Sequence, residues 1–171
     1  VMSGGEKIVY DEIVTRIKSE SSSRDYILQA INQLQQYTSH PELLNDTVTF
    51  DFKRLKSSSA KFTRLFELLD VIKARNEKVL IFANHIKTID ILMYAVLEKY
   101  SFPSFCIDGR IDANERVSQI EAFSSVDGFS AMILNPTTAG MGLNITAANH
   151  VIHYSRQWNP ALEEQATARA Y

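Results

Sequence analysis

The sequence contains few of the residues that cross-link a chain, interrupt its helices and strands, or anchor it in a membrane. It has a single cysteine, Cys106, so no internal disulfide can form and a reducing compartment is expected. Six glycines and four prolines in 171 residues indicate few long loops. The longest apolar run, residues 91–97, is far shorter than the roughly 18–20 residues of a membrane span. We therefore expect no membrane partner.

Several motifs for nucleotide and metal binding are also missing. No phosphate-binding loop of the form GxxxxGK[ST] is present, and no acidic pair follows a predicted strand. His150 and His153 lie three apart on a predicted strand, so their side chains point to opposite faces and predict no metal site. The net charge of −2 is not that of a free-standing nucleic-acid binder. The chain can contact a nucleotide or a nucleic acid through a local patch but cannot hold a nucleotide alone, which indicates half of a site.

Residues 1–56 form a first region that we interpret as a helical lead-in followed by a connector. Residues 6–18 and 24–37 have helical patterns, and Ser21–Ser23 can cap the second helix. That helix has an apolar stripe and ends at His40-Pro41, because the residue before proline avoids the helical conformation. Leu43 and Leu44 offer an apolar anchor, and residues 45–60 look like a connector. The stripe consists of Ile27, Leu28, Ile31 and Leu34.

Residues 57–171 form a second region in which predicted strands alternate with predicted helices. The strands are expected at 78–83, about 104–107, 131–134 and 151–154, with helical patterns of 10–15 residues between most of them. One of these helices opens with the capping box Asp112–Glu115 and directs Val117, Ile120 and Phe123 inward. Such alternation predicts an α/β fold, a parallel sheet with helices on both faces.

Polar residues follow each predicted strand. The carboxyl ends of parallel strands share one edge of the sheet, where ligands gather. We therefore expect one functional edge. Its segments are Asn84-His85, Asp108-Gly109-Arg110, Asn135-Pro136-Thr137-Thr138 and Ser155-Arg156-Gln157-Trp158.

Two glycines, Gly140 and Gly142, follow one of these strand ends. Their backbone can approach a phosphate closely, and the hydroxyls of Thr137 and Thr138 can bond phosphate oxygens. A plain strand-to-helix turn that needs positive φ is the alternative. Trp158, the sole tryptophan, could stack on a base or fill the core beneath its loop.

The last fourteen residues read as a helix with a start and no end. Asn159 can cap it, and Pro160 suits its first position. Gln165 and Arg169 lie four apart and therefore share a face. There the Arg169 guanidinium could stabilise the charge that develops during phosphoryl transfer, as an arginine finger does. A solvated helix face with Glu163 or Glu164 as partner is the alternative.

Together these segments resemble the second RecA-like lobe, the helicase C-terminal domain, of the Swi/Snf-type helicase-like ATPases of superfamily two, in particular bacterial-type members. KVLIFANH (78–85) resembles motif IV, and CIDGRIDANERVSQIEAF (106–123) resembles the Asp-Gly loop and its helix. ILNPTTAGMGLNITAANHVIHYSRQWNP (133–160) resembles motif V, and EEQATARAY (163–171) resembles the start of motif VI. Upstream, residues 27–44 resemble the segment that leads into this lobe.

The resemblance implies a motor lobe of an ATP-dependent duplex-DNA translocase. A first RecA-like lobe would precede this segment in the parent protein and hold most of the ATP and Mg²⁺, and the sequence would stop inside motif VI, before a second arginine. Arg169 and Gln165 would be catalytic, and Gly140 and Gly142 would lie near the nucleotide. The implied DNA-binding residues are Asn84, His85, Gly109, Arg110, Thr137, Thr138 and Trp158.

Two other functions stay open. The chain could be a RecA-like lobe kept as a non-catalytic binding or regulatory module, or a lobe of an RNA helicase. The Trp-Asn-Pro segment and the Gln165–Arg169 spacing favour the duplex-DNA branch over the RNA helicase. The implied location is the bacterial cytoplasm, with the nucleoid, or the eukaryotic nucleus, and a protein target is possible.

Overall fold

The computed structural model of the chain describes residues 2–20, 24–45, 47–102, 104–139 and 145–156, together with residues 161, 164, 167 and 168. The chain divides into two compact units, Val1–Phe66 and Glu67–Tyr171. The division falls inside a helix, α4 (Ala60–Ala74). The domain boundary after residue 56 stays a prediction.

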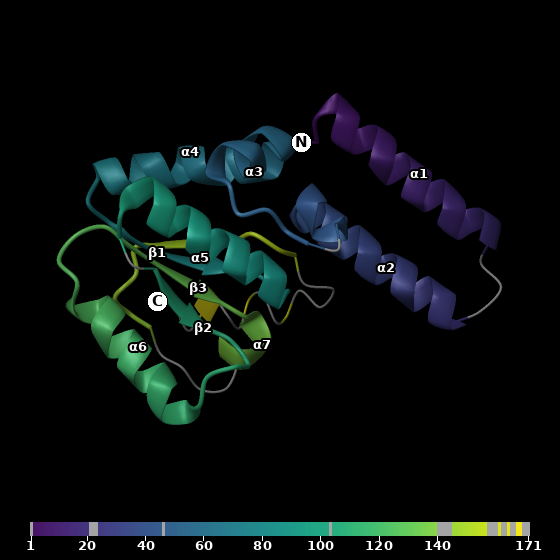
Figure 1. The fold of residues 1–171 in the computed structure, drawn as a ribbon. Helices are drawn as coiled ribbons and strands as arrows, with labels where there is room; N and C mark the ends of the chain where they lie inside the picture. The colour runs from purple at the N-terminus through teal and green to yellow at the C-terminus, as the bar shows by residue number, and fades with distance from the viewer. Residues whose placement is uncertain are drawn as a thin grey trace. The chain divides into compact units, whose positions relative to one another are not determined.

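The first unit begins with two helices, α1 (Gly4–Glu20) and α2 (Arg24–Ser39), which lie side by side and run in opposite directions (Figure 1). Both helices were predicted. The Tyr37 hydroxyl of α2 donates a hydrogen bond to the Glu6 carbonyl of α1 at 2.9 Å. The predicted cap at Ser21–Ser23 lies outside the described residues.

The predicted apolar stripe of α2 is wrong in part. Ile27 and Leu28 are exposed, and Ile31 and Leu34 are only half-buried. The buried side chains of α2 include Ala30 and Tyr37, which are seven residues apart and so share a face of the helix. The buried face of α2 therefore includes a small residue, Ala30, and a hydrogen-bonded tyrosine, Tyr37. A pattern of large apolar residues does not reveal such a face.

The connector expected at residues 45–60 contains a helix, α3 (Phe52–Ser58), so this prediction was wrong there. Asp51 caps α3, since its Oδ1 accepts a hydrogen bond from the Arg54 amide at 2.7 Å. Leu55 then buries its side chain completely. Of the predicted anchor, Leu43 in the short helix η1 (Pro41–Leu44) is buried and Leu44 is exposed.

The second unit is built on a four-stranded parallel sheet, as predicted. Its strands are β1 (Lys78–Phe82), β2 (Phe105–Ile107), β3 (Ser130–Leu134) and β4 (His150–His153), in the spatial order β2-β3-β1-β4. β1 and β3 are buried almost throughout, which explains their continuous apolar sequences.

Helices cover both faces of this sheet, α5 (Ile86–Tyr100) on one and α6 (Ala113–Ser125) on the other (Figure 1). Side chains alternate along each strand, so Leu80 and Phe82 share a face with Met132 and pack with Phe123 of α6. Asp112 caps α6 through bonds from the Asn114 and Glu115 amides, as predicted.

Val117, which was predicted to point inward, is in solvent, and so is Leu97, the last residue of the longest apolar run. Val117 of α6 is 52% exposed and Leu97 of α5 is 54% exposed. On α6, the side chain that enters the core completely is Phe123, and Ile120 packs against its edge. The helix therefore meets the sheet along its C-terminal half, and Val117, in the preceding turns, is left uncovered.

Candidate functional site

The ends of the four strands are joined by backbone hydrogen bonds that continue beyond the strands. The Ala83 amide donates to the Leu134 carbonyl, the Asn135 amide to Ile107, and the Tyr154 amide to Phe82, each at 2.9 Å. The loops that follow β2, β3, β1 and β4 therefore start side by side along one edge. This arrangement confirms that the strand ends share one edge, and the function of that edge stays a prediction.

Two asparagines link neighbouring loops of the edge. The Asn135 side-chain amide donates to the Asn84 carbonyl at 2.9 Å, and the Asn84 side-chain amide donates to the Arg156 carbonyl at 3.2 Å. Asn84 thus lies at the predicted edge, and one function of its amide is to position the loop after β4. Asn135 was predicted to lie at this edge but was not among the implied DNA-binding residues, and its role in joining two strand ends was not predicted.

Asn135 also starts the short helix α7 (Pro136–Ala139). Its Oδ1 accepts hydrogen bonds from the Thr137 amide at 3.0 Å and the Thr138 amide at 3.4 Å. The signal was in the sequence, because Asn135-Pro136 repeats the cap-plus-proline pattern that predicts a helix at Asn159-Pro160. Of the two threonines, Thr137 is exposed and Thr138 is buried, with 6% of its surface accessible. The glycines Gly140 and Gly142 lie outside the described residues.

The loop after β2 carries an ion-pair cluster of Asp108, Arg110 and Asp90. The Arg110 guanidinium donates to Asp108 Oδ2 at 2.6 Å and to Asp90 of α5 at 2.8 Å. Gly109, which lies between Asp108 and Arg110 in the sequence, is exposed. Apart from atoms of its two chain neighbours, no atom lies within 4 Å of the position that a Cβ would occupy on Gly109. The cluster fixes the loop against α5 and leaves the Gly109 backbone accessible. No sequence pattern connects Asp90 with Arg110, because the contact is tertiary.

The charges of this cluster are set by their mutual contacts. Burial opposes ionisation of Asp108, which is 1% exposed, yet the hydrogen bonds and charge of Arg110 hold its pKa below the ordinary value. Asp108 and then Asp90 raise the pKa of the Arg110 guanidinium. A phosphate that binds Arg110 therefore competes with two carboxylates. Burial, then the Asp108 charge, raises the pKa of the nearby Cys106 thiol to about 12, so this cysteine is no nucleophile at neutral pH.

His85 precedes α5 and lies half-buried at the same edge. Burial lowers the pKa of its imidazole, so His85 is neutral at pH 7. Its Nε2 is buried, and among the described residues no group forms a hydrogen bond with that atom. The neutral imidazole adds no charge to the edge, and its buried Nε2 is not accessible to a phosphate.

The two histidines of β4 have different partners, and no metal ion is needed to explain either. His150 Nε2 lies 2.6 Å from a carboxylate oxygen of Glu77. His153 stacks on Phe82, with ring centroids 5.1 Å apart and planes inclined by 17°, and its Nε2 lies 2.9 Å from the Thr167 hydroxyl. Thr167 is helical, and so are residues 161, 164 and 168. The predicted site residues Trp158, Gln165 and Arg169 lie outside the described residues.

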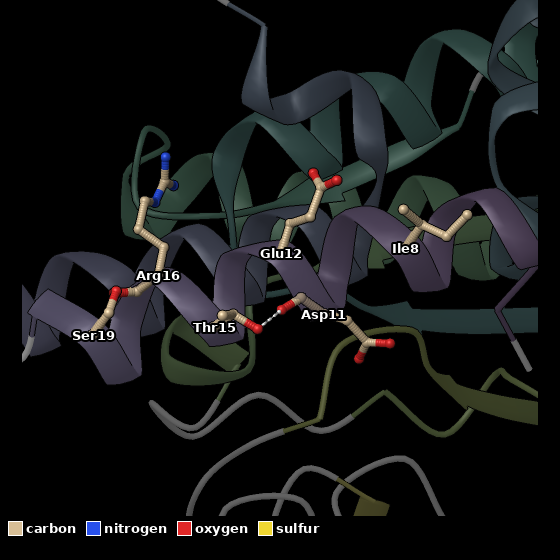
Figure 2. Close-up of a pocket in the computed structure, with 6 residues that line it drawn as sticks. All are labelled: Ile8, Asp11, Glu12, Thr15, Arg16 and Ser19. Carbon is tan, nitrogen blue, oxygen red and sulfur yellow. Dashed lines mark hydrogen bonds between the residues drawn. The ribbon is translucent and has the colours of Figure 1, made fainter.

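A hollow of about 560 Å³ lies elsewhere, along one side of α1. Figure 2 shows its lining residues on successive turns of that single helix, with the Thr15 hydroxyl donating to the Asp11 carbonyl at 2.8 Å. Acidic, basic and apolar side chains alternate there, and no set of polar groups converges on a point. The lining residues are Ile8, Asp11, Glu12, Thr15, Arg16 and Ser19.

Within the described part of the chain, no three His, Cys, Asp or Glu side chains come together as metal ligands. Among the same residues, no helix has the length and apolar character that crossing a bilayer requires.

Comparison with known proteins identifies the family. Residues 60–171 match the family described as the helicase conserved C-terminal domain. The chain is 38% identical over 146 residues to Bacillus subtilis YwqA, covering 85% of this chain and 15% of YwqA. It is 35% identical over 145 residues to the ATP-dependent DNA helicase DDM1 of Arabidopsis thaliana, covering 81% of this chain and 19% of DDM1. The chain thus spans less than a fifth of the length of either relative.

Solved structures share the fold. The Sulfolobus solfataricus SWI2/SNF2 ATPase C-terminal domain matches 94% of this chain and 71% of its own with a TM-score of 0.77 and 24% identity. The core of a Sulfolobus solfataricus SWI2/SNF2 ATPase in complex with double-stranded DNA matches 99% of this chain and 36% of its own, with a TM-score of 0.78 and 24% identity. These likenesses confirm the predicted RecA-like fold. The chain belongs to the helicase conserved C-terminal domain family, which confirms the resemblance that its motifs predicted.

Proposed function

We propose that the chain is the second motor lobe of an ATP-dependent translocase that moves on duplex DNA. The observation that carries this proposal is the edge at which four parallel strand ends and the helix containing Thr167 meet, in a chain of the helicase C-terminal family. A first RecA-like lobe of the same parent protein would hold ATP and Mg²⁺, because this chain contains no phosphate-binding loop.

In this proposal Arg169 completes the catalytic site of the other lobe. The guanidinium would bond the phosphoryl group as its charge develops, with Gln165 beside it, and arginine fingers of this kind are worth about 10³–10⁵ in rate. Gly140 and Gly142 would let the backbone approach the nucleotide. Closure of the two lobes would be favoured because these charge-assisted bonds exist only when the lobes are closed.

The sheet edge would grip the DNA backbone. Thr137 is exposed and offers a hydroxyl, and Gly109 offers an accessible backbone amide, both suited to phosphate oxygens. Such contacts carry no sequence information, so movement is expected on any sequence. The complete proposed set is Asn84, His85, Gly109, Arg110, Thr137, Thr138 and Trp158.

The test is ATP hydrolysis by the parent protein with duplex DNA, single-stranded DNA and single-stranded RNA. We expect duplexes of two unrelated sequences to stimulate hydrolysis equally and more than either single strand, and the 171-residue chain alone to hydrolyse no ATP. Stronger stimulation by RNA would favour the RNA helicase. Absence of hydrolysis with every nucleic acid would favour the non-catalytic module.

The proposed DNA edge has its own test. Replacing Thr137 with alanine should weaken duplex binding by the parent protein several-fold on both DNA sequences, because a backbone contact is lost. The matched control is Thr15→Ala, since Thr15 is also exposed but lies on α1. Equal affinities for the two variants would contradict the proposed edge.

A further inference from the structure

The two carboxylates that bind the Arg110 guanidinium hold it in unequal ways. Asp108 Oδ2 accepts hydrogen bonds from Nη2 at 2.6 Å and from Nε at 3.0 Å, and its Oδ1 accepts a bond from the Arg110 amide at 2.9 Å. Asp90 of α5 makes one contact, in which its Oδ1 lies 2.8 Å from the same Nη2 atom. Asp108 alone therefore suffices to hold the guanidinium at the end of β2.

The two carboxylates also differ in their exposure to solvent. The side chain of Asp108 is 1% exposed, whereas those of Asp90 and Arg110 are 39% and 48% exposed. Separating Arg110 from Asp108 would leave a buried carboxylate without its cation, which is strongly unfavourable. Separating Arg110 from Asp90 costs little, because water already reaches both groups. Asp90 is therefore the partner that an incoming anion can replace.

The position and the charge of this cluster bear on DNA binding. Asp90 lies in the second turn of α5, the helix that begins directly after the functional edge at the end of β1. One guanidinium faces two carboxylates, so the cluster has an excess of negative charge, which repels a phosphate. Without the charge of Asp90, Arg110 and Asp108 would balance, and a phosphate would meet less repulsion and no competing anion.

We propose that Asp90 limits the affinity of this lobe for duplex DNA, because its carboxylate competes with a DNA phosphate for the Arg110 guanidinium. This inference rests on the proposed function of the edge. A motor lobe has to release each phosphate before it advances along the duplex. A guanidinium that returns to Asp90 on release has a partner in both states, so the loop after β2 grips the backbone reversibly.

The experiment measures binding of duplex DNA by the parent protein at several salt concentrations. Asp90→Asn keeps the shape of the side chain and removes its charge, and it should lower the Kd for duplex by about three- to tenfold at about 0.1 M salt. The gain should shrink as the salt concentration rises, because it is electrostatic. The slope of affinity against salt should therefore steepen, by up to about one counterion.

The matched control is Glu98→Gln, which removes the same charge from an exposed position of α5. Position 98 lies about 12 Å further along the helix axis than Asp90, which exceeds the Debye length of about 10 Å at 0.1 M salt. This control should change the Kd by less than about twofold. An equal gain in the two variants, or no gain in Asp90→Asn, would overturn the inference.

A combined variant tests whether the gain depends on Arg110. Asp108→Asn with Arg110→Gln neutralises both members of the buried pair, so no buried carboxylate is left without its cation. Adding Asp90→Asn to this background should change the Kd no more than Glu98→Gln does, because no guanidinium remains to be released. A full gain there would contradict the competition. The comparison of Asp90→Asn with Glu98→Gln decides the inference without this background if the combined variant does not fold.

Failure of this inference can be told from failure of the proposed function. If Thr137→Ala weakens duplex binding while Asp90→Asn leaves it unchanged, the edge binds DNA without competition at Arg110. If Thr137→Ala and Asp90→Asn both leave duplex affinity unchanged, the proposed edge fails, and the inference fails with it.

Discussion

The two units of the chain are stabilised in different ways. In Glu67–Tyr171, a parallel sheet is buried on both faces by apolar side chains such as Leu80 and Ile133. In Val1–Phe66, large apolar side chains such as Leu28 are exposed, and buried polar groups connect the helices. The comparison teaches that continuous apolar runs predict the buried strands of the second unit well, whereas helical periodicity predicts the buried side chains of α2 poorly.

The polar contacts of the first unit centre on His40, which is 1% exposed. Its Nδ1 accepts a hydrogen bond from the Glu42 amide at 3.2 Å, so its Nε2 carries the proton and donates to the Leu55 carbonyl at 3.0 Å. The ring also packs edge-on against Phe62 at 5.3 Å. One neutral imidazole thus joins the end of α2 to α3.

The largest expected effect is in the second unit. Phe123→Ala removes a completely buried ring and should lower the free energy of unfolding by about 3–5 kcal/mol, because a cavity remains in the core. Urea unfolding followed by circular dichroism measures it. The matched control on the same helix is Val117→Ala, which should cost no more than about 0.5 kcal/mol. Equal losses of unfolding free energy in the two variants would contradict the conclusion that Phe123 is covered by the sheet and Val117 is not.

The next effect concerns the polar contacts of the first unit. His40→Ala removes a partner of the Glu42 amide and of the Leu55 carbonyl, which still accepts a hydrogen bond from the Ser58 hydroxyl, and should cost about 1–3 kcal/mol. The control is His150→Ala in the second unit, where a half-exposed pair with Glu77 is lost and about 1 kcal/mol or less is expected. Hydrogen exchange resolved by peptide assigns each loss to its unit.

Acid should weaken the first unit through the same histidine. Burial lowers the pKa of His40 from its ordinary value of 6.5, although Leu55, Glu42 and Glu6 oppose this shift. Below pH 6.5 the unfolded chain therefore binds a proton that the folded chain does not, and stability falls as the pH drops. Amide exchange near Glu42 and Leu55 should show the loss. A His40→Gln variant with the same pH dependence there would contradict this assignment.

The smallest effect belongs to an ion pair of the first unit that joins the buried carboxylate of Glu42 to the exposed guanidinium of Arg54. Glu42 accepts two hydrogen bonds from Arg54, at 3.0 and 3.2 Å, and these lower the pKa of its carboxyl. Because the Arg54 side chain is 53% exposed, Glu42→Gln should cost only about 0.5–1 kcal/mol in urea unfolding. A loss as large as that of His40→Ala would show that charge, and not the buried imidazole, holds this unit together.

Local patterns in the sequence were sufficient to predict the strands and the edge at which they end. Continuous apolar runs predicted β1 and β3, and polar residues after the strands predicted the common edge. The helix α3 was missed because its signal consists of one cap, Asp51, and one buried residue, Leu55, within a charged segment. Val117 was wrongly predicted to be buried. Helical periodicity predicts which side of the helix a residue lies on, but it does not predict how far along the helix the sheet covers that side.

The remaining features depend on contacts between residues distant in sequence. Asp90 meets Arg110, and His153 meets Thr167, at distances that only the fold determines. Nothing in the local sequence around these four residues indicates their partners. Asn135 differs, because its Asn-Pro signature was readable and only its bridge to Asn84 needed the structure.

The most direct test of the account is the turnover of the parent protein with Arg169 replaced by alanine. We expect duplex-stimulated ATP hydrolysis to fall by about 10³–10⁵ while nucleotide affinity changes by less than a few-fold. The control is Arg75→Ala, an exposed arginine that follows α4 at the opposite end of β1, and it should leave turnover unchanged. Turnover by Arg169→Ala within tenfold of the unaltered protein would contradict the claim that this lobe completes the catalytic site.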